Sequence, residues 1–161
     1  MSGGILVDSS VLLDVLTEDD LWFGWSSSAL ASAAERGPLH INPIILADVS
    51  IRFTDAADLD IALPPSDFRR AAIPWPASFL AGKTFQEYRE RRDVRAATLP
   101  DFFVGAHAAV DDLVLLTRDA RRFRPYFPTV EFMAPDRDSI VRVAQAGRRD
   151  RRQSLIEWAE S

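Results

Sequence analysis

Short apolar segments recur along this chain of 161 residues, and a residue that can begin a helix follows each of them. Residues 5–7 (ILV) precede the tripeptide DSS at 8–10, and residues 39–41 (LHI) precede the dipeptide NP at 42–43. A brief, wholly apolar run is typical of a strand that is buried on both faces of a parallel sheet. Asp, Ser and Asn are preferred N-cap residues, and Pro is favoured in the first helical turn. The pattern therefore predicts strands that alternate with helices.

Two more strands are predicted, at residues 113–116 and 129–133. Residues 55–92 are expected to be helical in pieces, because Pro64-Pro65 and Pro74-Trp75-Pro76 interrupt them. The alternation predicts the α/β class, with a short parallel sheet of four to five strands and helices on both faces. The same reasoning places helices at 11–16, 21–36, 44–53, 77–92, 102–110 and 117–123.

The chain divides after Pro135 into a domain at 1–135 and a C-terminal tail at 136–161. The tail contains five acidic residues and six arginines, and its apolar residues suffice for two short amphipathic turns. Two interpretations remain open, a helix that binds a partner and a segment appended to the domain.

Composition excludes several kinds of chemistry. The chain has no cysteine and two histidines, so disulfides, thiol catalysis and cysteine-ligated zinc are impossible. A bound metal would be held mainly by oxygen. The start has no basic region ahead of its short apolar run, and no apolar stretch approaches the roughly 20 residues of a membrane span. We therefore expect a cytoplasmic protein without membrane association.

Four aspartates stand where parallel strands end or helices begin: Asp8, Asp48, Asp101 and Asp119. Each alone has an ordinary explanation, as a helix cap, a turn residue or, for Asp48, a surface pair with Arg52. Together they are expected to meet at one sheet edge, where ligands of open parallel sheets bind. Crowded carboxylates repel each other, and a divalent cation would relieve that repulsion.

The ligand chemistry favours Mg²⁺ or Mn²⁺, which prefer carboxylate and water oxygens. Such an ion supports phosphodiester hydrolysis without a Ser, Cys or His nucleophile. Ser9 and Thr117, which neighbour two of the aspartates, are candidates to bind a water or a phosphate.

Four segments resemble the PIN-domain ribonucleases, and most closely the VapC toxins of prokaryotic toxin–antitoxin pairs. They lie in order and at the family's spacing across about residues 3–134. The most specific of them is LPDFFVGAHA. The four are VDSSVLL at 7–13, NPIILAD at 42–48, LPDFFVGAHA at 99–108 and LLTRDARRF at 115–123.

The resemblance implies a PIN-like three-layer α/β/α sandwich and an endoribonuclease that depends on Mg²⁺ or Mn²⁺. In it, Asp8 and Asp101 would bind the principal ion, and Asp48 and Asp119 would orient waters or hold a second ion. Family members usually have Glu at the position of Asp48. The resemblance also implies a homodimer, and a cognate antitoxin whose inhibitory segment lies near the acidic site. Basic clusters provide candidates for gripping the RNA backbone: Arg118, Arg121, Arg122, Lys83 and Arg92.

Two alternative functions remain open. The shorter side chain of Asp48 motivates a catalytically weakened module that binds antitoxin or RNA without cleaving it. A nuclease that acts on structured DNA is a further alternative. His107 follows Asp101 on an apolar helix and is interpreted as a core residue. The helix with Trp22 and Trp25 and the region 44–63 are apolar enough to line a groove for the antitoxin segment, and the alternative for these aromatic residues is an ordinary core position.

Overall fold

The computed structural model describes residues 3–93 and 96–160. Five strands form one sheet in the order β3-β2-β1-β4-β5, and every neighbouring pair is parallel. β1 is therefore the central strand. The strands are β1 (Ile5–Val7), β2 (Leu39–Ile41), β3 (Phe68–Arg70), β4 (Val114–Leu116) and β5 (Phe132–Met133).

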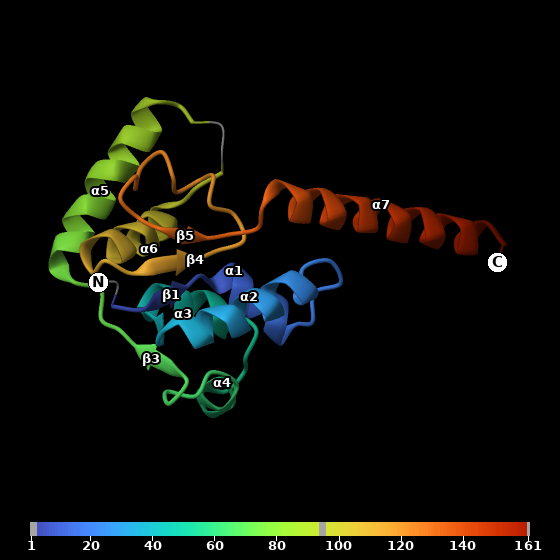
Figure 1. Cartoon of the computed structure of the whole chain (residues 1–161), viewed down its shortest axis with the longest axis horizontal. Coiled ribbons are helices and arrows are strands. Elements are labelled where there is room, and N and C mark those ends of the chain that lie inside the picture. Colours follow the sequence, from blue (N-terminus) through green and yellow to red (C-terminus); the bar gives the residue numbers. More distant parts are fainter. Residues whose placement is uncertain (1–2, 94–95, 161) are drawn as a thin grey trace.

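Helices cover both faces of this sheet, as Figure 1 shows, with α5 and α6 on one face and α1 and α2 on the other. α7 extends away from this layered body. The predicted α/β class and layer arrangement are confirmed. The helices are α1 (Ser9–Leu16), α2 (Phe23–Arg36), α3 (Pro43–Ser50), α4 (Ala56–Ala62), α5 (Trp75–Glu90), α6 (Leu99–Val110) and α7 (Arg137–Glu160).

The predicted local signals form the elements next to the sheet edge. The Asp8 side chain accepts a hydrogen bond from Ser9 N at the start of α1. Asn42 caps α3 by accepting from Ile45 N at 2.9 Å. All three residues of β1 and of β4 are buried, as expected for strands covered on both faces.

Three features of the domain differ from the sequence-based prediction. Residues 117–123 form no helix: the chain makes successive turns at 121–126 instead, and Pro125 prevents these turns from continuing as a helix. β3 was not predicted, since only Phe68 of its three residues is buried and two exposed arginines follow. The predicted strand at 129–133 pairs only at its last two residues.

The C-terminal segment is one helix of 24 residues rather than two short turns. Its contact with the body includes Gly147, which is buried against Leu21. Ile156 and Trp158 near its end are exposed. In the part of the chain that is described, no helix combines the length and the apolar character needed to cross a membrane. The division of the chain after Pro135 stays a prediction.

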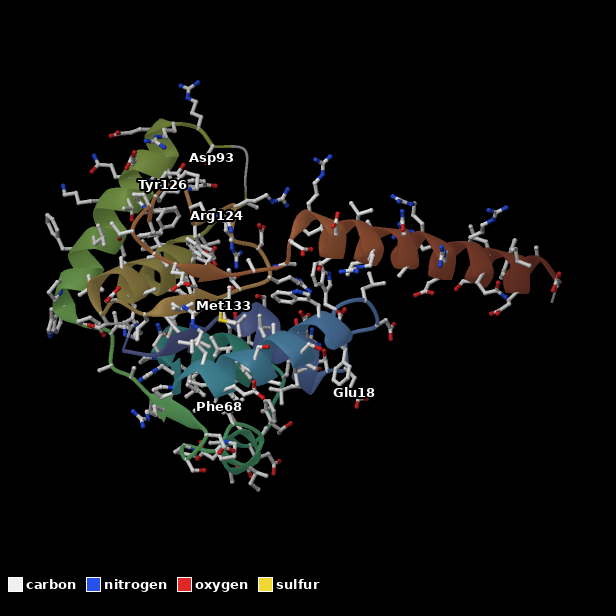
Figure 2. The ribbon with its side chains drawn as sticks, viewed as in Figure 1. Glu18, Phe68, Asp93, Arg124, Tyr126 and Met133 are labelled. Carbon is white, nitrogen blue, oxygen red and sulfur yellow. The ribbon has the colours of Figure 1, made fainter. Side chains whose placement is uncertain are left out.

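An aromatic cluster holds the turns at 121–126 against α6. The rings of Phe102 and Tyr126 lie 5.3 Å apart, and those of Phe102 and Phe127 lie 5.9 Å apart. Tyr126 also donates a hydrogen bond to Asp93 at 2.8 Å, a pair that can be seen in Figure 2. Phe127 lies so close to Gly105 that a Cβ atom there would fall 2.3 Å from the ring. Gly105 thus sets how closely this loop approaches α6.

We predict that Gly105→Ala destabilises the protein by about 1–3 kcal/mol, because the added methyl group overpacks the contact with Phe127. The control is Gly82→Ala on α5, where no atom lies within 4 Å of the new Cβ. That change should stabilise the protein by about 0.5–1 kcal/mol through helix propensity. Thermal unfolding followed by circular dichroism measures both. Equal effects of the two substitutions would contradict the packing argument.

Candidate active site

Parallel pairing of β1 and β4 brings two polar residues together where these strands end. Val7 and Leu116 are partners in the register, and Asp8 N donates to Leu116 O at 2.8 Å. Thr117 is fully buried and donates its hydroxyl to Asp8 Oδ2 at 2.8 Å. The predicted neighbours Asp8 and Thr117 thus share one hydrogen bond at the sheet edge.

Asp8 is a buried carboxylate surrounded by donors. It is 3% exposed, and it accepts from Ser9 N at 2.9 Å, Ser10 Oγ at 3.1 Å and Thr117 Oγ1. Burial raises the pKa of Asp8, while the positive charge of Arg122 and the hydroxyl donors oppose that rise. The site therefore holds a carboxylate whose ionised form depends on nearby positive charge.

Asp101 faces the same point from α6. Its Oδ2 accepts from Thr98 N at 2.8 Å, so its place in the first helical turn is fixed. The Arg122 guanidinium lies between the two carboxylates, with Nη2 3.3 Å from Asp8 Oδ2 and Nη1 3.4 Å from Asp101 Oδ1. The negative charge of Asp101 contributes to the raised pKa of Asp8. Two predicted metal ligands thus share one cation supplied by the chain itself.

Asp48 and Asp119 do not contact Asp8 directly, but each is hydrogen-bonded to a residue that does. Asp48 Oδ2 accepts from Ser9 Oγ at 3.0 Å, and among the described residues it forms no ion pair with Arg52. Asp119 donates its backbone N–H to Thr117 Oγ1 at 3.3 Å, and its carboxylate faces Arg121. Ser9 and Thr117 therefore connect the outer aspartates to the central one.

These oxygens suit a hard divalent cation, but they are not a closed cage. Within 3–93 and 96–160, no three metal-ligating side chains converge on one point. Mg²⁺ usually keeps several waters and binds through one or two carboxylates together with substrate phosphates. Asp8 and Asp101, whose carboxylates contact the same guanidinium, provide two such carboxylates. Asp8 and Asp101 are the residues that could hold such an ion.

A groove of about 970 Å³ lies beside the carboxylates and reaches the start of α7. Arginines dominate its polar lining, and Trp22 lies in it with its ring 5.2 Å from the Arg118 guanidinium. Acidic lining residues are Asp119 and Asp136. The arginines of the groove are Arg118, Arg121, Arg122, Arg124 and Arg137.

The five basic residues predicted to grip RNA divide into two groups. Arg118, Arg121 and Arg122 line this groove, whereas Lys83 lies on α5 and Arg92 follows that helix, and neither lines the groove. Arg118 is also held by Asp14, at 2.8 Å. Their roles in RNA binding stay predictions.

Sequence reasoning missed two contributors. Asp14 is buried, accepts from Ser26 Oγ at 2.7 Å and positions Arg118 at the groove. Ser10 donates to Asp8, although it was interpreted only as part of a cap. A signal existed for Asp14, since it lies three residues after the apolar Val11, on the face of the helix that meets the core. No sequence signal placed Arg122 between the carboxylates.

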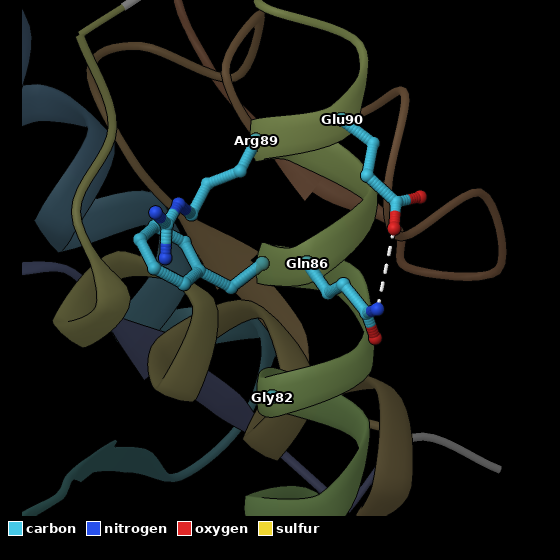
Figure 3. A pocket seen from close by; sticks show the side chains of 5 residues that line it. Gly82, Gln86, Arg89 and Glu90 are labelled. Atoms are coloured by element: carbon cyan, nitrogen blue, oxygen red, sulfur yellow. Dashed lines mark hydrogen bonds between the residues drawn. The ribbon is translucent and has the colours of Figure 1, made fainter.

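A second pocket, of about 430 Å³, lies on α5 and is drawn in Figure 3. The Arg89 guanidinium stacks 6.0 Å from the Phe85 ring, and Gln86 donates to Glu90 at 3.2 Å. All lining residues come from one helix and none of the four aspartates is among them. This pocket therefore has no part in the candidate site.

Comparison with solved structures identifies the fold. The chain is similar to VapBC2 of Rickettsia felis bound to promoter DNA, with 14% identity, a TM-score of 0.61, and coverage of 82% of this chain and 98% of that one. For VapBC-1 of nontypeable Haemophilus influenzae the values are 12%, 0.63, 81% and 96%. For VapC20 of Mycobacterium tuberculosis, a toxin that cleaves the sarcin–ricin loop, they are 16%, 0.56, 79% and 98%.

The chain has the PIN-like fold of VapC-type toxins, as its sequence motifs predicted. No model of a protein family matches the chain, and no curated protein matches it in sequence. The likeness therefore lies in the arrangement of the elements, at low sequence identity.

A buried histidine connects the helices that carry Asp48 and Asp101. His107 on α6 is fully buried, and its Nδ1 lies 3.1 Å from the side-chain nitrogen of Asn42, the N-cap of α3. Nδ1 therefore accepts, and Nε2 donates to Asp111 at 3.1 Å. This confirms the interpretation of His107 as a core residue. Burial lowers the pKa of His107, an effect that Asp111 opposes.

We predict that the protein loses stability as the pH falls below about 6.5, the ordinary pKa of histidine. The native pKa of His107 is depressed, so its stabilising contribution is complete above that pH and is lost as the pH falls toward the native value. Tm measured between pH 7.5 and 5 should decrease more steeply for the wild type than for His107→Gln. Since His40 is present in both proteins, equal slopes would exclude His107 as the cause.

Proposed function

We propose that this protein is a metal-dependent endoribonuclease and the toxin of a type II toxin–antitoxin pair. The main observation behind this proposal is that the carboxylates of Asp8 and Asp101 both contact the Arg122 guanidinium at the carboxyl edge of the sheet. The VapC-type fold supports the assignment, since one neighbour with this fold is a toxin that cleaves the sarcin–ricin loop.

The chain's own residues would divide the work as follows. Asp8 and Asp101 would hold Mg²⁺ or Mn²⁺, which when bound activates water and neutralises charge on the phosphate. Asp48 and Asp119 would orient waters, because Ser9 and Thr117 connect them to Asp8. The five-arginine groove would bind the RNA backbone next to these oxygens.

A cognate antitoxin and a second copy of the chain are the expected protein partners. Several neighbours with this fold were solved as VapBC or other toxin–antitoxin complexes. Large apolar side chains on the surface would supply area for such contacts. Among them are Ile51, Ile61, Trp75 and Phe79.

We predict that the purified protein, freed of antitoxin, cleaves structured RNA with Mg²⁺ or Mn²⁺ and is inactive in EDTA. Asp8→Asn and Asp101→Asn should each reduce the cleavage rate by roughly a hundredfold or more, because each removes a charged ligand. Asp58→Asn, which changes an exposed carboxylate on α4, is the matched control and should retain full activity. Cleavage that persists in EDTA would refute the metal assignment, and a parallel DNA substrate would identify a deoxyribonuclease.

A second candidate is a module that binds antitoxin or RNA without cleavage. Asp48 favours it, because its carboxylate is one methylene shorter than the glutamate usual in the resembled family. Calorimetry discriminates between the two: absence of Mn²⁺ binding together with tight binding of antitoxin would support the module.

We predict that the groove, and not α5, binds RNA. Arg124→Ala should weaken RNA binding and reduce the slope of log affinity against log salt by about 1, because one phosphate contact is lost. Lys83→Ala removes the same charge on α5, outside the groove, and should leave the slope unchanged. Fluorescence anisotropy with labelled RNA in EDTA measures binding without cleavage. A larger effect of Lys83→Ala would move the RNA site to α5.

A further inference from the structure

Arg122 occupies the point that a divalent cation would need. Its two terminal nitrogens contact Asp8 Oδ2 and Asp101 Oδ1, one oxygen of each carboxylate. A metal ion bound by both carboxylates would lie close to the guanidinium, and two cations so near each other repel. The two cations therefore compete for one pair of carboxylates.

The contacts of Arg122 are those of a side chain held by charge rather than by ideal hydrogen bonds. Its distances of 3.3 and 3.4 Å exceed the roughly 2.7–2.9 Å of a good charge-assisted hydrogen bond. Its Nε is buried and has no hydrogen-bond partner among the described residues. One positive charge also leaves two carboxylates half neutralised. A doubly charged ion would balance them.

The backbone of Arg122 is fixed while its side chain adjoins two environments. The next residue, Phe123, is buried in the core, and the aromatic contacts of Tyr126 and Phe127 hold the same loop on α6. The Arg122 side chain is 22% exposed and also lines the groove that holds the other arginines. The side chain of Arg122 thus adjoins the carboxylates and the groove at once.

We propose that Arg122 is a positioning residue that couples metal binding to RNA binding. It neutralises Asp8 and Asp101 while no divalent ion is bound, and it moves into the groove to contact an RNA phosphate when the ion takes its place. This inference rests on the proposed function. Metal and RNA then favour each other's binding reciprocally, because each favours the same position of one side chain.

This role gives Arg122→Ala two opposite effects. Mn²⁺ affinity measured by calorimetry without RNA should rise by roughly fivefold or more, the ordinary scale of coupling between sites, because the competing cation is gone. At saturating Mn²⁺, KM for RNA should rise, because the phosphate contact is gone. Arg122→Lys keeps one positive charge and should restore much of the wild-type behaviour in both measurements.

Arg124→Ala is the matched control for general charge, since Arg124 belongs to the same loop and groove and contacts neither carboxylate. It should change Mn²⁺ affinity by less than about twofold, as expected for a screened, more distant charge. The inference is overturned if the wild type binds Mn²⁺ and Arg122→Ala binds it equally or more weakly. Failure of the wild type to bind Mn²⁺ would instead overturn the proposed function, and the inference about Arg122 would fall with it because no ion would compete for the carboxylates.

Discussion

The parallel pairing of β1 with β4 is the interaction on which the candidate site depends. It places Asp8 and Thr117, residues 109 positions apart in the chain, within one hydrogen bond of each other. Both strands are wholly buried, so their register is fixed by apolar packing on two faces. The cost of burying the Asp8 carboxylate is therefore met by the stability of the sheet and by the donors around it.

A second constraint links α3 and α6, the helices that carry Asp48 and Asp101, through a buried side chain outside the four aspartates. His107 joins α6 to the N-cap of α3, while Thr98 fixes Asp101 within the first turn of α6. The contact between His107 and Asn42 involves none of the four aspartates at the sheet edge. A site that must exchange one cation for another benefits from such a frame, because only a side chain has to move.

Local sequence signals were sufficient for much of this arrangement. The residues that end β1 and β2 begin helices, so the alternation, the parallel sheet and the edge position of Asp8 followed from residue types at short spacing. β3 could not be predicted, because an edge strand with one buried residue leaves no apolar run. The turns at 121–126 were misjudged because the charged residues before Pro125 have good helix propensity.

The least predictable feature is also the most informative one about function. Arg122 was assigned to RNA on the basis of its charged neighbours, and no pattern in the sequence places it between Asp8 and Asp101. Its position depends on how Tyr126 and Phe127 pack on α6, which is a tertiary effect of aromatic volume and of the missing side chain at Gly105. The core thus determines the electrostatics of the site. Because the loop packs closely on α6, the Arg122 guanidinium lies beside the carboxylates of Asp8 and Asp101.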